Sequence, residues 1–192
     1  MLELETEQLL MRKLTLDDAE AMVPIYADTE IRRWMHIEAA VTLETEKDRI
    51  TQHLEKYPLD GPYGFCATIL KESGEIVGRC GLLRQRVDGE TATEVAYLIA
   101  RSHWGRGLAT EAATALRDYA LETLGERRLI SMILLDNIAS QRVALKIGMS
   151  HERDTTWRSL QIGIYSLSRD RPLPFFDGAD HGHGSAGSGA NG

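Results

Sequence analysis

The stretch that decides the fold is residues 104–112, which read Trp104-Gly105-Arg106-Gly107-Leu108-Ala109-Thr110-Glu111-Ala112. It joins a strand-like run, residues 93–99, to a long helical pattern that begins near Ala109. Gly105 and Gly107 can adopt positive φ, and the amides of a first helical turn have no partners inside the helix. Such amides bind phosphate oxygens. The junction predicts a loop that holds a diphosphate, although a plain strand-to-helix turn also uses glycine.

Other sequence signatures of phosphate binding or nucleophilic catalysis fit less well. The chain has no Gly-Lys-Ser/Thr, which nucleoside triphosphate loops require. It also lacks a third glycine and an acidic residue at the spacing of a dinucleotide site. No Gly-x-Ser-x-Gly elbow is present, so a serine hydrolase is disfavoured.

Residues 104–112 resemble the acetyl-CoA loop of the GNAT acyltransferase superfamily, in particular its ribosomal-protein N-terminal acetyltransferase branch. The family pattern, Gln/Arg-x-x-Gly-x-Gly/Ala, falls on Trp104, Gly107 and Ala109. A second block, residues 135–149, resembles the family's Asn-x-x-Ser helix that ends in Lys-x-Gly-Phe. Residues 7–20 are a weaker third match, so that the resemblance spans about residues 5 to 168.

This resemblance implies an α/β (α+β) fold with one domain, whose sheet is mixed and mainly antiparallel. About seven strands are expected, flanked by helices, with a central strand pair that splays apart to admit the pantetheine arm. The implied activity is transfer of an acetyl group from acetyl-CoA, without a metal, to a primary amine on a protein N-terminus or a small molecule. The implied cofactor-binding residues are Tyr97, Leu98, Ile99, Gly105, Arg106, Gly107, Leu108, Ala109, Thr110 and Asn137.

Length and composition predict one domain. With 192 residues, 43% of them hydrophobic, the chain can bury one core, which we place in residues 1–176. Residues 177–192 are rich in Gly, Ser and Ala and are expected to be disordered. No apolar stretch is long enough to span a bilayer, and the acidic start lacks a secretory pattern, so we expect a cytoplasmic protein.

The charge pattern disfavours a nucleic-acid partner. The formal net charge is −7 and no run of Lys and Arg supplies a phosphate-binding patch. An acidic protein suits a cationic amine acceptor, although moderate acidity also serves solubility alone. Cys66 and Cys80 lie on two strand-like runs of one hairpin, where we expect them to pack as small apolar residues. The sequence does not distinguish a monomer from a homodimer.

Periodicity predicts the remaining elements. Thr15 and Asp18 favour a capped helix from about Leu16, which Pro24 should kink or end. Thr42 could cap a helix that carries Ile50, Leu54 and Tyr57 on one face. The expected strands are residues 8–14, 65–70, 76–83, 93–99, 129–135, 150–157 and 160–167, and the later helices are residues 109–124, ended by Gly125, and 137–147.

In family members the segment corresponding to residues 31–57 covers the acceptor site. Four aromatic residues could line that site, although each is also suited to packing against the core. These are Trp34, His36, Tyr63 and Trp157.

The implied chemistry is attack of a neutral amine on the thioester carbonyl, which needs a base, an oxyanion donor and a group at the leaving sulfur. Glu94 is the candidate base, against the alternative of a solvent-facing strand glutamate. The family implies a backbone amide near Leu98 as the oxyanion donor. Ala144 stands where many family members have a tyrosine that acts as the general acid for the leaving thiolate. Ser140 is therefore the candidate catalytic residue that would hydrogen-bond this sulfur.

Two ambiguities remain at this stage. Ser140 could equally serve as an ordinary residue of a helix start, and the alternative for Asn137, which we expect to hold the pantetheine arm, is an N-cap alone. The missing tyrosine also keeps open a second class of function, a non-catalytic protein that binds CoA for regulation.

Overall fold

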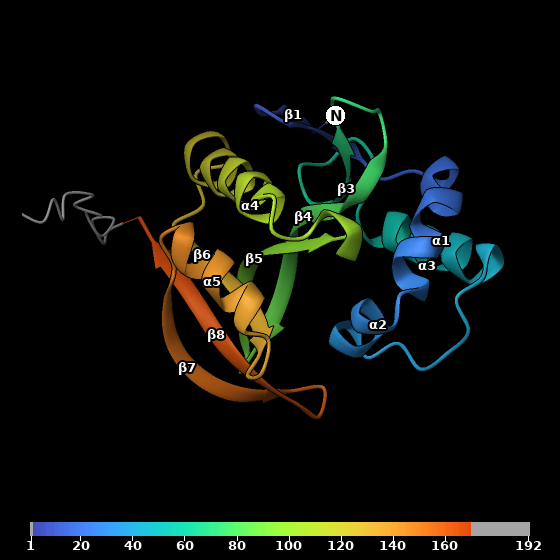
Figure 1. The fold of residues 1–192 in the computed structure, drawn as a ribbon. Helices are drawn as coiled ribbons and strands as arrows, with labels where there is room; N and C mark the ends of the chain where they lie inside the picture. The colour runs from blue at the N-terminus through green and yellow to red at the C-terminus, as the bar shows by residue number, and fades with distance from the viewer. Residues whose placement is uncertain (1, 170–192) are drawn as a thin grey trace, which may run out of the picture.

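A computed structural model of the chain describes residues 2–169. It consists of one eight-stranded sheet in the order β1-β2-β3-β4-β5-β6-β8-β7, with helices on both faces (Figure 1). All neighbouring strands are antiparallel except β5 and β6, which run parallel. The fold is therefore the mixed, mainly antiparallel sheet that the sequence predicts, with one strand more than the approximate number expected.

The strands are β1 (Glu3–Glu5), β2 (Leu9–Lys13), β3 (Gly64–Leu70), β4 (Ile76–Val87), β5 (Glu90–Ile99), β6 (Arg128–Leu134), β7 (Ser150–Trp157) and β8 (Leu160–Ser168). The α-helices are α1 (Ala19–Ala27), α2 (Thr29–Met35), α3 (Leu43–Lys56), α4 (Leu108–Asp118) and α5 (Ile138–Lys146). Short 3₁₀ segments cover Leu16–Asp18 and Arg101–His103, and a π-helical turn, Tyr119–Thr123, extends α4.

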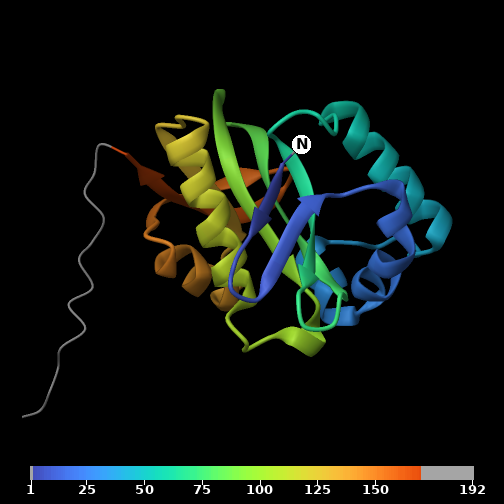
Figure 2. The same ribbon diagram turned by 90° about the horizontal axis from the view of Figure 1, so that it is seen from above.

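The two faces of the sheet carry different helices. Helices α4 and α5 lie on one side, and α1, α2 and α3 lie on the other (Figures 1 and 2). Alternation along β5 sends Val95 and Ile99 into the core beneath α4, where Leu108 and Leu116 are buried. Leu98 packs on the opposite face with residues of α1 and α3. The sheet therefore separates two hydrophobic layers.

Strands β5 and β6 part soon after they meet. Their parallel register contains only Thr93 with Leu129 and Glu94 with Ile130. By contrast, the pairing of β4 with β5 continues to Ile99, which lies opposite Gly78. The remainder of β5 is therefore open on its β6 side. This is the splayed strand pair implied by the family resemblance.

The first helical region differs from its prediction. The chain turns through a 3₁₀ segment before α1, and the backbone amide of Thr15 donates to the Asp18 carboxylate at 2.8 Å, as a capping arrangement requires. Pro24 was expected to kink or end this helix, but α1 continues to Ala27. Pro24 therefore does not end the helix, which ends at Ala27 because Asp28, in extended conformation, caps the start of α2.

Several other predictions are confirmed. Thr42 caps α3, accepting a hydrogen bond from the Thr45 amide at 3.2 Å. Cys66 and Cys80 are directly opposite in the β3–β4 hairpin, and both are buried free thiols. Burial raises the pKa of Cys66 to about 11. The prediction for residues 177–192 lies outside the described residues.

Candidate active site

A cavity of about 790 Å³ lies at the opening between β5 and β6. One side of the cavity is formed by the loop at the start of α4 and by the first turns of α5. Its other side is formed by α2 and by the sheet face that carries Phe65, Arg79 and Glu94. The opening therefore connects two faces of the sheet through one space, large enough for an extended ligand.

The glycine loop has the backbone that the sequence predicts. Gly105 and Gly107 have φ of +80° and +81°, and Gly107 is the residue from which α4 begins. As a glycine, this N-cap residue has no side chain with which to cap the helix start. Gly105, Gly107, Leu108, Ala109 and Thr110 all line the cavity, whereas Arg106 is directed to Glu72, with a nitrogen–oxygen distance of 3.9 Å. The loop thus presents backbone rather than cationic side chains.

Two anchors fix this loop at its ends. The Trp104 indole nitrogen donates to the Ile99 carbonyl at 2.7 Å. The Glu111 carboxylate accepts from the Gln8 backbone amide and from Gln8 Nε2, both at 2.7 Å. Burial opposes ionisation of Glu111, but these bonds and one from Thr6 outweigh it and lower its pKa. The start of α4 is therefore tied to the turn between β1 and β2.

Glu94 is buried, with 8% of its surface exposed, and it lines the cavity. Its carboxylate accepts a hydrogen bond from Gln85 Nε2 at 2.8 Å. Burial raises its pKa above the ordinary value, and the Gln85 hydrogen bond, the Met132 backbone on β6 and the charge of Arg79 only partly offset that effect. The alternative of a solvent-facing glutamate is therefore wrong.

The backbone of β5 presents alternate residues to the opening. The Ile99 carbonyl accepts from Trp104 and the Val95 carbonyl accepts from Ser131 Oγ. The backbone N–H and C=O groups of Val95, Tyr97 and Ile99 therefore point away from β4. The Ala100 amide donates to β4, and Leu98 has the same parity. The expected donor near Leu98 is therefore not Leu98 itself, because its amide faces β4. The amides of Tyr97 and Ile99 face the opening.

The first turn of α5 is joined to β5 at the cavity. The Tyr97 hydroxyl donates to the Ser140 carbonyl at 2.8 Å, and the Asn137 side chain accepts from the Ser140 amide at 3.1 Å. Asn137 is therefore an N-cap in this structure, and it also lines the cavity, as do Tyr97 and Ser140. Ala144 is fully buried and supplies no acidic group.

Three of the four aromatic candidates line the cavity, namely Trp34, His36 and Trp157. Tyr63 does not, because its hydroxyl donates to Glu126 at 2.6 Å, at another place on the sheet. Arg79 and Gln85 also lie on the same sheet face as Glu94, although neither belongs to a sequence motif. Alternation along the expected strand, residues 76–83, could have placed Arg79 on this face, whereas Gln85 lies beyond the expected end of that strand.

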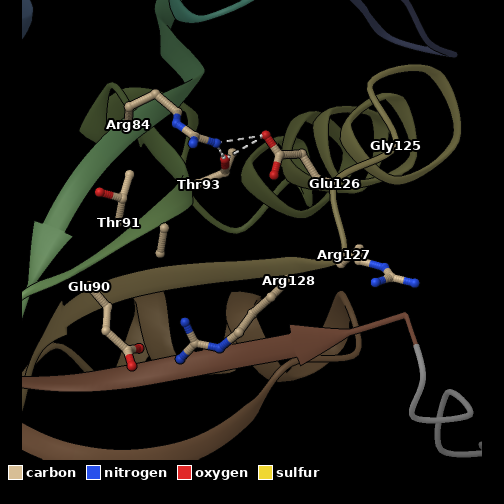
Figure 3. Close-up of a pocket in the computed structure, with 9 residues that line it drawn as sticks. Arg84, Glu90, Thr91, Thr93, Gly125, Glu126, Arg127 and Arg128 are labelled. Atoms are coloured by element: carbon tan, nitrogen blue, oxygen red, sulfur yellow. Dashed lines mark hydrogen bonds and ion pairs between the residues drawn. The ribbon is translucent and has the colours of Figure 1, made fainter.

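A second cavity, of about 420 Å³, lies where β5 and β6 pair closely (Figure 3). Three of its five charged lining residues, Arg84, Glu126 and Arg128, are already partnered. Arg84 and Thr93 donate to the same Glu126 oxygen at 3.0 and 2.8 Å, and Arg128 pairs with Glu152 at 2.7 Å. This cavity is separate from the glycine loop, so we assign no part of the candidate site to it.

Neither a cluster of metal-ligating side chains nor a membrane-spanning helix is present in residues 2–169. Within residues 2–169, no three His, Cys, Asp or Glu side chains are grouped in a way that could hold a metal ion. In the same part of the chain, no helix combines the length and the apolar character needed to cross a membrane.

Comparison with known proteins agrees with this geometry. The family model for the acetyltransferase (GNAT) domain matches residues 8–150. The uncharacterized N-acetyltransferase p20 of Bacillus licheniformis is 30% identical over 150 residues, which cover 78% of this chain and 83% of that protein.

Solved structures agree as well. An acetyltransferase from Agrobacterium tumefaciens str. C58 has a TM-score of 0.72 at 28% identity, covering 88% of this chain and 95% of that one. RimL, a ribosomal L7/L12 alpha-N-protein acetyltransferase solved with coenzyme A, has a TM-score of 0.69 at 14% identity, covering 85% and 95%. At that identity the likeness concerns the fold. The chain belongs to the acetyltransferase (GNAT) domain family.

Proposed function

We propose that this protein transfers an acetyl group from acetyl-CoA to a primary amine, on a small molecule or a protein N-terminus. The observation that carries the proposal is the cavity between β5 and β6, which joins an uncapped helix start to a buried carboxylate. The family performs acetyl transfer, and the coenzyme A in the RimL structure supports the choice of donor.

The loop residues fit the anionic part of acetyl-CoA. The positive φ of Gly105 and Gly107 turns the chain into α4, whose first amides would bind the diphosphate. The Arg106 side chain points to Glu72, so it is less suited to binding the diphosphate than the loop backbone is. Its predicted part in cofactor binding stays a prediction. The free edge of β5, with the Tyr97 and Ile99 amides, would hold the pantetheine arm in the same way that a strand pairs with its neighbour.

The residues on the acceptor face would remove the amine proton. Glu94 is enclosed and its pKa is raised, which brings a carboxylate closer to the range useful for a general base. Proton transfer through one water molecule is compatible with its position in the cavity floor. An α-amine, with an ordinary pKa of about 7.7–8.0, needs little help near neutrality, whereas a lysine at about 10.4 needs more.

Backbone amides of β5 would stabilise the negative charge that develops on the thioester carbonyl oxygen. A tetrahedral oxyanion needs a preorganised donor, and the Tyr97 and Ile99 amides face the opening where it would form. Ser140 is the proposed hydrogen-bond donor to the departing sulfur, since the structure supplies no tyrosine at position 144. A thiolate is a good leaving group, so a hydroxyl can suffice here.

Purified protein, acetyl-CoA and a panel of amines, read by release of free thiol and by mass spectrometry of the product, test the proposal. We expect an acetylated amine whose formation requires the protein. CoA binding without transfer to any acceptor of the panel would instead favour the non-catalytic CoA-binding alternative. Absence of CoA binding would contradict both functions.

A further inference from the structure

Arg79 lines the acceptor half of the central cavity. It lies opposite Leu98 in the β4–β5 register, and Leu83 lies opposite Glu94, so Arg79 and Glu94 share one face of the sheet. The Arg79 guanidinium carbon is 3.7 Å from the centroid of the Phe65 ring and 5.2 Å from that of Tyr26. Aromatic packing therefore positions this cation.

Within residues 2–169, Arg79 has no carboxylate partner. Its Nε is buried and makes no hydrogen bond in this part of the chain. Two carboxylates feel its charge, but both have other partners: Glu46 pairs with Arg49 at 2.9 Å, and Glu94 accepts from Gln85 at 2.8 Å. No carboxylate of residues 2–169 therefore contacts the Arg79 guanidinium as a countercharge, although the charge of Glu94, which neutral Gln85 leaves uncompensated, still acts on it from further away.

An anionic group on the ligand would supply this countercharge. A partly buried cation without a partner is unfavourable, and the planar guanidinium matches a carboxylate with two parallel hydrogen bonds. One unpaired positive charge is balanced by one negative charge, which favours a carboxylate over a phosphate monoester that carries nearly two.

The surroundings of Arg79 also constrain the rest of the acceptor. Ala96 lies between Leu98 and Glu94 on the same face of β5, and its small side chain leaves space above the strand. The cavity lining on the same sheet face as Glu94 includes Leu83 and Met132, and Trp157 belongs to the same apolar cluster as Met132. An acceptor with an apolar side chain fits these walls better than a strongly polar one.

We propose that the acceptor is an amine that carries a carboxylate, of the type of a hydrophobic amino acid, and that Arg79 binds this carboxylate. The amine then points to the β5–β6 opening, on the face where Glu94 lies. This inference rests on the proposed acetyl transfer and narrows its acceptor to a class. It makes Arg79 a specificity-determining residue.

The test compares leucine with leucinamide as acceptors for the full chain with acetyl-CoA, by thiol release. Because amidation also lowers the amine pKa, kcat/KM is expressed per neutral amine. We expect leucine to be preferred at least tenfold. Arg79→Met keeps a long apolar stem on Phe65 but removes the charge, and should reduce the preference ratio at least tenfold. Arg86→Met is the matched control, since Arg86 is an exposed arginine of the same strand outside the cavity, and should keep the ratio.

The outcomes separate this inference from the proposed function. Calorimetry with CoA on each variant reports whether the cofactor half is intact. If CoA binds and amines are acetylated, but the wild type prefers the amide or Arg79→Met leaves the ratio unchanged, the inference is wrong and acetyl transfer stands. If CoA does not bind the wild type, the proposed function itself fails. Should Arg79→Met not fold, the wild-type preference alone decides.

Discussion

Gln85 Nε2 donates to the Glu94 carboxylate at 2.8 Å, from one strand to its neighbour. This contact offsets part of the cost of burying a carboxylate in the floor of the cavity. The hydrogen bond therefore holds the Glu94 carboxylate in one orientation. Burial raises the Glu94 pKa, and the bond from Gln85 counteracts part of that rise. Because Gln85 contacts the proposed base directly, substitution of either residue should change the pH dependence of turnover.

Glu94→Gln is expected to retain CoA binding and to lower turnover by about a hundredfold at neutral pH, because general-base catalysis contributes about 10²–10⁴. The loss should shrink as rising pH deprotonates the acceptor without help. Turnover of both proteins across a pH series checks this. Equal turnover at neutral pH would remove Glu94 from the mechanism.

Gln85→Leu should shift the pH profile without abolishing activity. Removing a donor to the carboxylate raises the Glu94 pKa further, since the hydrogen bond favours the charged form. A bond to a charged group is worth about 1.5–3 kcal/mol, which corresponds to a shift of about one unit or more in the acidic limb of kcat/KM. A profile that falls uniformly at all pH values would show that Gln85 does not act through Glu94.

His53 should make the fold sensitive to acid. Its Nε2 accepts from the Phe65 amide at 2.8 Å, and burial, with help from the Arg79 charge, lowers its pKa to about 4. The unfolded chain, with a pKa near 6.5, therefore binds more protons in the window from about 6.5 down to 4. Stability from this group is present above pH 6.5 and is lost as pH falls to about 4.

The variant His53→Gln supplies an acceptor that does not titrate, so its thermal midpoint should fall less between pH 6.5 and 4 than that of the wild type. Circular dichroism at a series of pH values measures this difference. Parallel curves for the two proteins would assign the acid sensitivity to other groups.

Removal of residues 178–192 should leave the thermal midpoint and acetyl transfer unchanged. The segment has no large apolar side chain to bury, so the sequence predicts that it adds little to the domain. Differential scanning fluorimetry and thiol release on a chain ending at Asp177 give the answer. A drop in activity, or an inhibition by chelators seen only with the segment present, would indicate that His181 and His183 take part in the site.

Much of the fold could be predicted because the residue patterns along the sequence match the observed strands and helices. The last two strands were expected at residues 150–157 and 160–167, and they occupy Ser150–Trp157 and Leu160–Ser168. The end of α1 was less predictable, since the capping of α2 by Asp28 decides it rather than Pro24.

The site shows the same division. The glycine loop was recognisable because its conformation depends on residue type at each position. The burial of Glu94 was not, because strand alternation gives its face but not what covers that face. Arg79 escaped notice for a similar reason, since its lack of a partner is a property of the packed structure.

Titration calorimetry of CoA with Gly107→Val and Gly89→Val tests the central claim, that the loop before α4 holds the cofactor. Both glycines have positive φ, +81° and +87°, and an added Cβ would meet no atom of the described chain within 4 Å at either one. Both variants therefore carry similar backbone strain, but only Gly107 lines the cavity. The account predicts at least a tenfold weaker Kd for Gly107→Val and a Kd within about twofold of wild type for Gly89→Val, where tenfold corresponds to about 1.4 kcal/mol. Wild-type affinity in a folded Gly107→Val protein would contradict it.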